Sequence, residues 1–495
     1  MWYRAKKIMS VIALTSMLSV MLAACGGENP TATTAPTGGG ATEATATTAT
    51  GGGATEATAT TATGGGATEA TATTATGGAT EATATTGGTT GGGAALQLPA
   101  NCSNVEVAFW NPWTGPDGPH MGDEVNAFNQ ENPNIKVTMT TLADYYTKLA
   151  TAAASDQLPD VAIIHVDQVP TWVFRNTIRP IDDLVSSIGL SASDYPAAVW
   201  NPGEVAGHRY SIPLDIHPMV MFYNADLLSA AGITEAPKTK DEFEKAAAAT
   251  TKNGVQGFSI TTGFPVRQIF EMLLHQFGGD AWDAKGTQAT WNSDAGVQAL
   301  TWMKDAQSKY SQPKLPVDAD LNALKAGQAA MIWNGIWQTT NVTGDAVDFK
   351  GMGAPPPQIG SQFFVWAGSH QFTIPVHKSG IDKCKEAASG IFIKYALDHS
   401  IEWAKAGQIP ALNKVRESAD FKNLHPQAEI AAAAEHVFYP PPVPGITDAW
   451  APLDDAVGAI MSGTSSDIKG TLDSAKQRAD QILQQNAQRY GTTPN

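Results

Sequence analysis

Two polar side chains that could bind a ligand lie two residues apart in an apolar stretch of the sequence. Asp215 and His217 alternate with Ile216, so both would share one face of an extended segment. The apolar runs 210–212 and 219–223 on either side predict short strands. Burying a polar pair without partners costs free energy. Two interpretations therefore remain open: a satisfied pair at a surface bend, or a crossing between two lobes that presents both side chains to a cleft.

Further candidates follow other predicted strands. The order strand, helix, strand, helix, strand over residues 105–164 predicts a parallel sheet with helices on its faces. Such sheets bind ligands beyond the carboxyl ends of their strands. Trp110 and Trp113 follow the first of these strands, and His165 and Asp167 follow the third. Because tryptophan is more often a packing residue than a ligand-binding surface, both roles stay open for Trp110 and Trp113.

The N-terminus has the parts of a secretion signal. Three basic residues within the first seven precede a mostly apolar run, and small residues then lead to Cys25. The apolar run is short for a membrane-spanning helix. The pattern resembles a bacterial lipoprotein signal, which implies a signal peptide over residues 1–24 and a lipid on the thiol of Cys25. Such a lipid would anchor the protein to the outer face of the membrane; the alternative is an ordinary secretory signal with an incidental cysteine.

Residues 25–99 predict a tether without a fold of its own. After the cysteine they are almost entirely Thr, Ala and Gly, and the unit GGGATEATATTAT recurs at 38–50, 51–63 and 64–76. With almost no large apolar side chain to bury, nothing offsets the entropy of the chain. We therefore expect a disordered linker that lets the folded part reach away from the membrane.

The rest of the chain is long enough for two lobes and has an acidic character. Its length exceeds what one hydrophobic core usually serves. The protein has 31 Lys and Arg against 47 Asp and Glu, a formal charge of −16, which argues against a nucleic-acid partner. Cys102 and Cys384 could pair outside the cytoplasm or remain buried thiols. No local Cys/His motif indicates a metal, so we expect no metal and no cofactor.

A series of motifs extends from the Asp215 segment into the following residues. Its order and spacing resemble the sugar-type extracellular solute-binding proteins of ABC importers, at positions where the chain passes from one lobe to the other. The matching residues are Gly207, Tyr210, Pro213, Tyr223, Asn224, Ala225, Asp226, Leu227, Ala231, Gly232, Pro237, Thr239, Glu242 and Phe243, with Thr239 and Glu242 also forming a helix-capping box.

The resemblance covers essentially all of residues 104–490 and implies a fold. It implies an α/β protein with the two-lobed periplasmic-binding-protein-like fold of type II, parallel-rich sheets with flanking helices and three crossings between the lobes. Lobe one would comprise residues 100–213 and 372–410, and lobe two residues 214–371 and 411–490. The resemblance further implies a monomer.

The resemblance also implies a function. The protein would bind a mono- or oligosaccharide between its lobes and deliver it to membrane permease subunits, which a separate ATPase drives, since the chain has no phosphate-binding loop. Aromatic rings match the apolar faces of a sugar, and planar polar groups bridge its hydroxyls. The candidate ligand-binding residues are Trp110, Trp113, Asp167, Asp215, His217, Phe264, Arg267, Trp333, Asn334, Trp337, Trp366 and His370.

Two other functions remain open at this point. A charged small solute, such as a glycerol phosphate or a polyamine, could pair with Arg267 or Asp215 in the same cleft. A secreted glycosidase could use Asp215 with a second carboxylate at a defined separation. The expectation is that the protein is a binding protein and not an enzyme.

Overall fold

The computed structural model describes residues 97–380, 382–432 and 439–491. The predicted signal peptide, the predicted lipidation at Cys25 and the repeat linker up to residue 96 lie outside the described residues. Within the ranges described, no helix combines the length and the apolar composition that a membrane span requires.

The first sheet has five strands in the order β2-β1-β3-β11-β6. The neighbours β2, β1 and β3 are parallel, whereas β11 runs antiparallel to both β3 and β6. Alternate residues of β1 are buried and β3 is buried almost throughout, as expected for strands covered by helices. The strands are β1 (Val105–Asn111), β2 (Ile135–Thr141), β3 (Val161–His165), β6 (Ser211–Pro213) and β11 (His370–Thr373).

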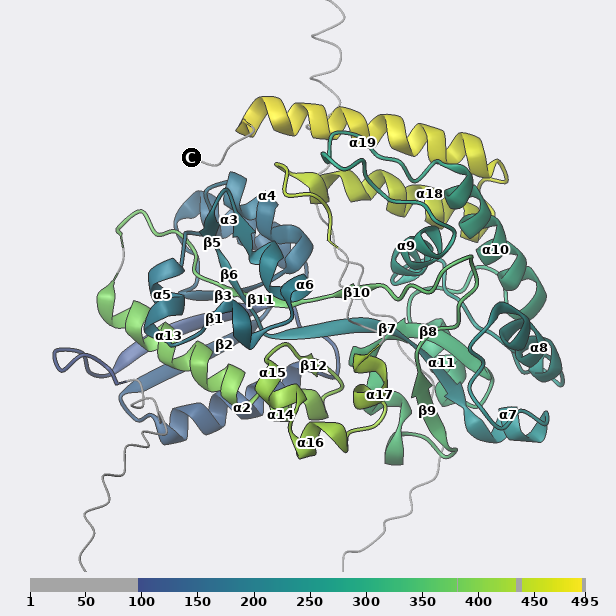
Figure 1. Ribbon diagram of the computed structural model, residues 1–495, viewed down its shortest axis with the longest axis horizontal. Coiled ribbons are helices and arrows are strands. Elements are labelled where there is room, and N and C mark those ends of the chain that lie inside the picture. The colour runs from purple at the N-terminus through teal and green to yellow at the C-terminus, as the bar shows by residue number, and fades with distance from the viewer. Residues whose placement is uncertain (1–96, 381, 433–438, 492–495) are drawn as a thin grey trace, which may run out of the picture. The chain divides into compact units, whose positions relative to one another are not determined.

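Helices and short turns of helix accompany this sheet, and we call the whole the first lobe. In Figure 1, α2 and α13 lie beside its strands. A small hairpin of β4 (Glu204–Val205) and β5 (His208–Arg209) precedes β6. The helical segments are α2 (Gly118–Glu131), α3 (Tyr145–Ser155), η1 (Val166–Gln168), α4 (Val169–Phe174), α5 (Asp182–Ser187), η2 (Ala192–Asp194), α6 (Ala197–Trp200), η3 (Asn201–Gly203), α13 (Lys383–Asp398) and α14 (Ser400–Lys405).

The second sheet is built around β7 (Asp215–Asn224). Every named strand that pairs with β7 is antiparallel to it: β8 (Met331–Gly335), β9 (Gly351–Ala354), β10 (Ala367–Gly368) and β12 (Ile409–Pro410). The strand expected at 255–260 is present only as isolated parallel bridges, which join Gln256 to Ala329 and Ser259 to Ile332. The expectation of parallel-rich sheets thus describes the first sheet better than the second.

The second sheet with its helices forms the second lobe. The capping box expected at Thr239 and Glu242 is present at the start of α8. The two C-terminal helices, yellow in Figure 1, pack against each other. The helical segments are α7 (Ala225–Ala230), α8 (Lys240–Thr250), α9 (Val266–Gln276), α10 (Asp294–Tyr310), α11 (Ala319–Lys325), η4 (Ile336–Gln338), α12 (Thr339–Val342), η5 (Gly344–Ala346), α15 (Asn413–Arg416), α16 (Ala419–Lys422), α17 (Gln427–Ala431), η6 (Ile446–Trp450), α18 (Ala451–Ser462) and α19 (Ile468–Tyr490).

Strand β7 divides its side chains between two hydrophobic clusters because successive residues of a strand face opposite sides. Val220 and Phe222 join the cluster that also contains the core of the first sheet. Met219 and Met221 join a separate cluster under the helices of the second lobe. The first of these clusters is continuous across both sheets, so the residue boundaries expected for the lobes stay a prediction.

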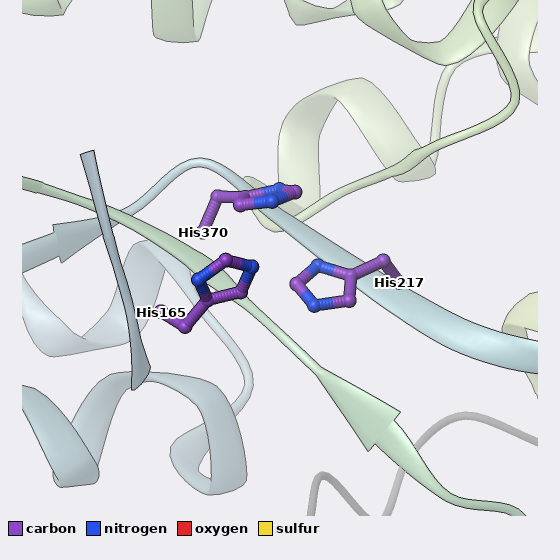
Figure 2. Close-up of side chains that lie close together, drawn as sticks. All are labelled: His165, His217 and His370. Carbon is purple, nitrogen blue, oxygen red and sulfur yellow. The ribbon is translucent and has the colours of Figure 1, made fainter. Parts of the chain in front are cut away.

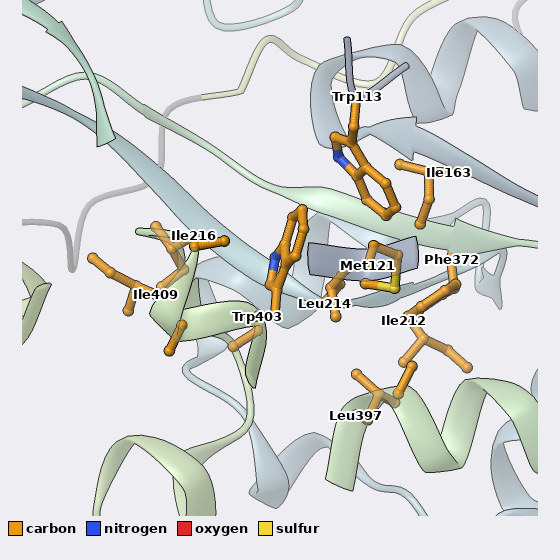
Figure 3. Packing of buried hydrophobic residues seen from close by; sticks show 14 of the residues in the cluster. Trp113, Met121, Ile163, Ile212, Leu214, Ile216, Phe372, Leu397, Trp403 and Ile409 are labelled. Carbon is orange, nitrogen blue, oxygen red and sulfur yellow. The ribbon is translucent and has the colours of Figure 1, made fainter. Parts of the chain in front are cut away.

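The chain passes between the two sheets at three neighbouring places. Leu214 joins β6 to β7, Ser369 joins β10 to β11, and β12 follows α14. The backbone N–H of Leu214 donates to the carbonyl of His370 at 2.8 Å, and that of Ala411 donates to Leu214 at 3.0 Å. Figure 3 shows Trp403 among apolar side chains from these segments. The three crossings therefore form one packed unit.

Cys102 and Cys384 form a disulfide, with their Cα atoms 5.5 Å apart. The bond joins the segment before β1 to the first turn of α13, which Asp382 caps by accepting the backbone N–H groups of Cys384 and Lys385. Of the two states that the sequence leaves open, the structure contains the paired one.

Candidate functional site

A cavity of about 810 Å³ lies where residues of both lobes meet. Its walls come from the segment after β1, from η1 and from His370 in the first lobe, and from β7, α9, η4, η6 and α18 in the second. Eight of the twelve residues expected to bind ligand line it: Trp113, Asp167, His217, Phe264, Arg267, Trp337, Trp366 and His370.

Trp110 and Trp333 do not line this cavity. Strand β8 extends to Gly335, so Trp333 lies within the strand and faces the core, where its ring stacks on Trp302 with centroids 5.5 Å apart. Strand β1 likewise extends to Asn111, and Trp110 packs beside the cluster of Tyr145. In both cases the strand is longer than its apolar run suggests, so the tryptophan is a strand residue rather than the first residue after a strand end.

Asn334 and Asp215 are also absent from the cavity wall. Asn334 is buried, and its amide donates to a carboxylate oxygen of Asp320 at 3.3 Å. Asp215 has no exposed surface. Asp215 lies next to the cavity residues His217 and His370, so it can orient their side chains without contacting a solute.

The Asp215 carboxylate accepts four hydrogen bonds. Nδ1 of His217 lies 3.1 Å from one oxygen, which also accepts the backbone N–H of His370 at 2.9 Å. Nδ1 of His370 and Nε1 of Trp403 both lie 2.7 Å from the other oxygen. Burial would raise the pKa of Asp215, but the facing imidazoles and their hydrogen bonds hold that pKa well below its usual range. An ionised carboxylate can only accept hydrogen bonds, so both histidines must carry a proton on the Nδ1 that faces Asp215.

Burial lowers the pKa of two imidazoles at this side of the cavity, His217 and His165. It lowers the pKa of His217 to about 4, and the nearby ring of His370 acts in the same direction. The pKa of His165 is also well below its ordinary value, first because of burial and then because of the other two histidines. These rings can therefore accept a hydrogen bond from a hydroxyl at neutral pH through the nitrogen that carries no proton.

The opposite side of the cavity holds a compact group of charges. Nε of Arg267 donates to Asp454 at 2.9 Å, and its guanidinium also pairs with Glu271 and lies over the ring of Trp450, 4.6 Å from the centroid. Burial raises the pKa of Glu271 to about 7, although Arg267 opposes the shift. Burial also raises the pKa of Asp167, which faces this group from the first lobe. The positive charge of Arg267 is thus already matched within the protein.

Aromatic rings form much of the remaining wall. Phe264 has 54% of its surface exposed and stacks on Trp337, with centroids 5.8 Å apart and planes at 25°. Trp366 lies on the other side of His217, with centroids 6.2 Å apart. Trp113 packs at right angles to His370 from the first lobe. A flat ligand face entering this cavity would therefore meet rings from both lobes.

Several wall residues were not among the twelve residues expected to bind ligand. His165 and Tyr146 come from the first lobe, and Trp450, Asp454 and Glu271 from the second. His165 does follow a predicted strand, which was a usable signal. The α18 residue Asp454 and its neighbour Trp450 belong to segments expected only to pack on the second lobe, and their amphipathic pattern contains no sign of a cavity.

Comparison with known proteins places these features in context. Residues 113–382 match the family model described as bacterial extracellular solute-binding protein. A maltotriose-binding protein of Pyrococcus abyssi is 21% identical over 389 residues, which are 78% of this chain and 83% of that protein.

Two solved structures share the fold. An ABC substrate-binding protein from Listeria monocytogenes in complex with cycloalternan is 20% identical, with a TM-score of 0.66 over 77% of this chain and 99% of that one. UgpB from Mycobacterium tuberculosis in complex with glycerophosphocholine is 17% identical, with a TM-score of 0.67 over 77% and 98%. At these identities the similarity establishes the fold alone. The kind of solute must be inferred from the residues that line the cavity.

Proposed function

Because the chain belongs to the bacterial extracellular solute-binding protein family, we propose that it is the extracytoplasmic substrate-binding component of an ABC importer for a neutral mono- or oligosaccharide. The sugar would lie in the 810 Å³ cavity and contact both lobes. Curated relatives that include a maltotriose-binding and a galactooligosaccharide-binding protein support this proposal.

The observation that carries the choice of a neutral sugar is the combination of aromatic walls with internally matched charge. Trp337, Trp366 and Trp113 offer flat apolar surfaces, which suit the C–H faces of a sugar ring. His217 and His370 each retain one nitrogen that can accept a hydrogen bond from a hydroxyl. Hydroxyl groups need partners of this kind, and they need no countercharge.

An anionic solute fits this wall less well. Among the described residues that line the cavity, Arg267 is the only arginine, and no lysine is present. Arg267 already pairs with Glu271 and Asp454. A phosphate would have to displace one of these carboxylates and leave it without its partner, which costs free energy in a buried site. A polyamine remains the charged alternative because the cavity contains more carboxylates than cations.

A glycosidase that uses Asp215 is disfavoured for a structural reason. Its carboxylate has no exposed surface and accepts four hydrogen bonds, so it could neither attack a sugar nor protonate one. We therefore propose a binding protein that leaves its ligand chemically unchanged. Lipidated Cys25 would anchor it, the repeat tether would carry it, and membrane permease subunits with a separate ATPase would receive the sugar.

Transport would depend on closure of the two lobes over the sugar. A sugar that contacts Trp113 from one lobe and Trp337 from the other favours the closed arrangement, because only that arrangement offers both contacts at once. The closed form would then dock on the permease.

A melting screen of the full chain tests the proposal. The protein is heated in buffer containing EDTA with mono-, di- and trisaccharides, glycerol phosphates or polyamines. A ligand present at 100 times its dissociation constant should stabilise the protein by about 2.7 kcal/mol. We expect at least one neutral saccharide to raise the melting temperature and to be recovered unchanged. A shift with charged compounds alone, or cleavage of the saccharide, would overturn the proposal.

A further inference from the structure

Three histidines from separate parts of the chain meet at the side of the cavity next to the crossings. His165 ends β3, His370 begins β11, and His217 lies in β7 of the second sheet. Each of the three rings has a nitrogen that lies within 4.8 Å of a ring nitrogen of the other two. Figure 2 shows the three imidazoles turned toward one another. Their ring centroids are 4.2 Å apart for His217 and His370 and 4.8 Å apart for His165 and His370.

The hydrogen bonds behind two of these rings determine which nitrogen is free. Nδ1 of His217 and Nδ1 of His370 both face the carboxylate of Asp215, at 3.1 and 2.7 Å. Each ring therefore donates from Nδ1, and Nε2 keeps its lone pair. In the part of the chain that the structure describes, neither Nε2 has a hydrogen-bond partner. A buried carboxylate behind a ligating histidine is the usual way in which proteins orient a metal ligand.

The third ring has a comparable support. The hydroxyl of Tyr146 accepts the backbone N–H of His165 at 3.0 Å, and Nδ1 of His165 lies 2.6 Å from the same oxygen. When Nδ1 carries the proton, the hydroxyl accepts both bonds and Nε2 of His165 is free. His165 is half-buried and lines the cavity, so its free nitrogen can be reached from there.

The backbone of Gly368 lies close to Nε2 of His217. Gly368 pairs with His217 across the strands β10 and β7, and a Cβ at position 368 would lie 2.3 Å from Nε2 of His217. Any larger residue would occupy the space directly in front of that nitrogen. The edge of the imidazole that faces the cavity is therefore accessible only because residue 368 is glycine.

We propose that His165, His217 and His370 form a Zn²⁺ site at this side of the cavity, with Asp215 and Tyr146 as the groups that orient the ligands. Three imidazole ligands with an open coordination position suit Zn²⁺. In a tetrahedral site with Zn–N bonds of about 2.0–2.1 Å, ligand nitrogens lie roughly 3.3 Å apart, so the rings have to move closer together to bind the metal. The open position faces the cavity, where a water or an oxygen of a solute would complete the coordination.

The site would also connect the two lobes. His165 and His370 belong to strands of the first sheet, whereas His217 belongs to the second. A bound metal would therefore oppose separation of the lobes on this side of the cavity. This inference goes beyond the proposed sugar binding and does not depend on it, because the three ligands are present whether or not a sugar binds.

Metal binding by the full chain without any sugar tests the inference. The protein is stripped with EDTA, moved to chelator-free buffer and titrated with Zn²⁺ in equilibrium dialysis, and the bound metal is measured by atomic absorption. We expect one Zn²⁺ per chain. Co²⁺ used in place of Zn²⁺ should give visible absorption bands of the intensity typical of four-coordinate nitrogen-rich sites. One metal per chain with such a spectrum supports the site, and weak octahedral-type bands overturn it.

Matched variants separate this site from incidental metal binding. His165→Gln, His217→Gln and His370→Gln should each lower the affinity for Zn²⁺ at least 100-fold, and Asp215→Asn about 10–100-fold. His208→Gln is the control, because His208 is an exposed histidine of the β4–β5 hairpin. Each variant is first checked for its fold by circular dichroism. His165 is half-buried, so its variant gives the decisive result if the others fail to fold.

Two results would overturn the inference. One is unchanged stoichiometry and affinity in folded His165→Gln, and the other is an equal loss in His208→Gln. Sugar binding is measured separately in EDTA, so loss of the metal site and loss of the proposed sugar function give different results.

Discussion

Removing the ion pair between Arg175 and Asp448 should weaken sugar binding although neither residue lines the cavity. Nη2 of Arg175 donates to both oxygens of Asp448, at 2.8 and 2.6 Å. Arg175 follows α4 of the first lobe, and Asp448 lies in η6, whose residues pack in the core of the second. Thr171 and Thr447 form a hydrogen bond of 2.8 Å beside them. Since these contacts join the lobes, we expect them to stabilise the closed arrangement.

The structure bounds the size of the effect. The side chains of Arg175 and Asp448 are 25% and 36% exposed, so water screens much of their attraction. Exposed ion pairs contribute about 0.2–1 kcal/mol, and a guanidinium that reaches both carboxylate oxygens belongs at the upper end of that range. A loss of about 1 kcal/mol from the closed form raises the dissociation constant about five-fold when the free protein is mostly open.

A double-mutant cycle measures this contribution. Calorimetric titration with the sugar from the melting screen is carried out on Arg175→Ala, Asp448→Ala, the double variant and the unchanged protein. We expect a coupling energy of about 0.5–1 kcal/mol that decreases at high salt. The cycle also cancels the contribution of the hydrogen bond that Asp448 accepts from Asn486, because both variants without Asp448 lack that bond.

The matched control for this cycle is Arg179→Ala. Arg179 pairs with Glu386 at 2.6 Å entirely within the first lobe, so its loss should lower the melting temperature and leave sugar affinity unchanged. A coupling energy of zero, or an equal loss of affinity in Arg179→Ala, would refute the reasoning that the Arg175 pair acts through closure.

Three further predictions concern the cavity wall, the disulfide and a buried carboxyl group. Gly335→Ala should displace Trp337, because a Cβ at position 335 would lie 2.0 Å from the indole of Trp337, whereas the backbone φ of −78° suits alanine. Calorimetry should show a loss of sugar affinity similar to that of Trp337→Ala. Unchanged affinity in Gly335→Ala would contradict this prediction. Replacing Cys102 and Cys384 by serine should lower the free energy of unfolding in denaturant by about 2–4 kcal/mol without altering sugar affinity. Burial raises the pKa of Glu124 to about 8, and its carboxylate oxygens have no partner among the described residues. Because the folded protein holds this proton more tightly than the unfolded chain, Glu124 favours folding below about pH 4.5, and this advantage is lost as the pH rises to about 8. Glu124→Gln should remove a decline on the order of 5 kcal/mol, measured by denaturation at several pH values.

Much of the fold could be predicted because its signals are local. The alternation in β1, the uninterrupted apolar run of β3 and the capping box at Thr239 each show in a few consecutive residues. The second sheet was harder to predict. The segment at 255–260 has the apolar pattern of a strand, but only two of its residues pair with neighbours, and its pairing depends on the position of β8, some 70 residues later.

The tryptophans expected to bind ligand fall into two groups, one that lines the cavity and one that does not. Trp113 and Trp337 follow the last residues of β1 and β8 and line the cavity, whereas Trp110 and Trp333 lie within those strands. An apolar run does not reveal where a strand ends, because pairing with a neighbour can extend the strand through polar residues such as Asn111. Trp113 lies three positions after Trp110 and Trp337 lies four positions after Trp333, and only the later tryptophan of each pair lines the cavity.

Asp215 shows why the spacing of two residues does not determine which of them faces a cavity. Its spacing from His217 suggested that both side chains face a cleft, yet only His217 does. The difference comes from Trp403 and His370, which are 188 and 155 residues further along the chain and which enclose the carboxylate from the other crossings. A buried carboxylate that accepts four bonds holds the three crossings together and orients two of the imidazoles that face the cavity. A pattern of two residues cannot distinguish a ligand-binding group from the group that positions it, since the partners that decide between them are distant in the sequence.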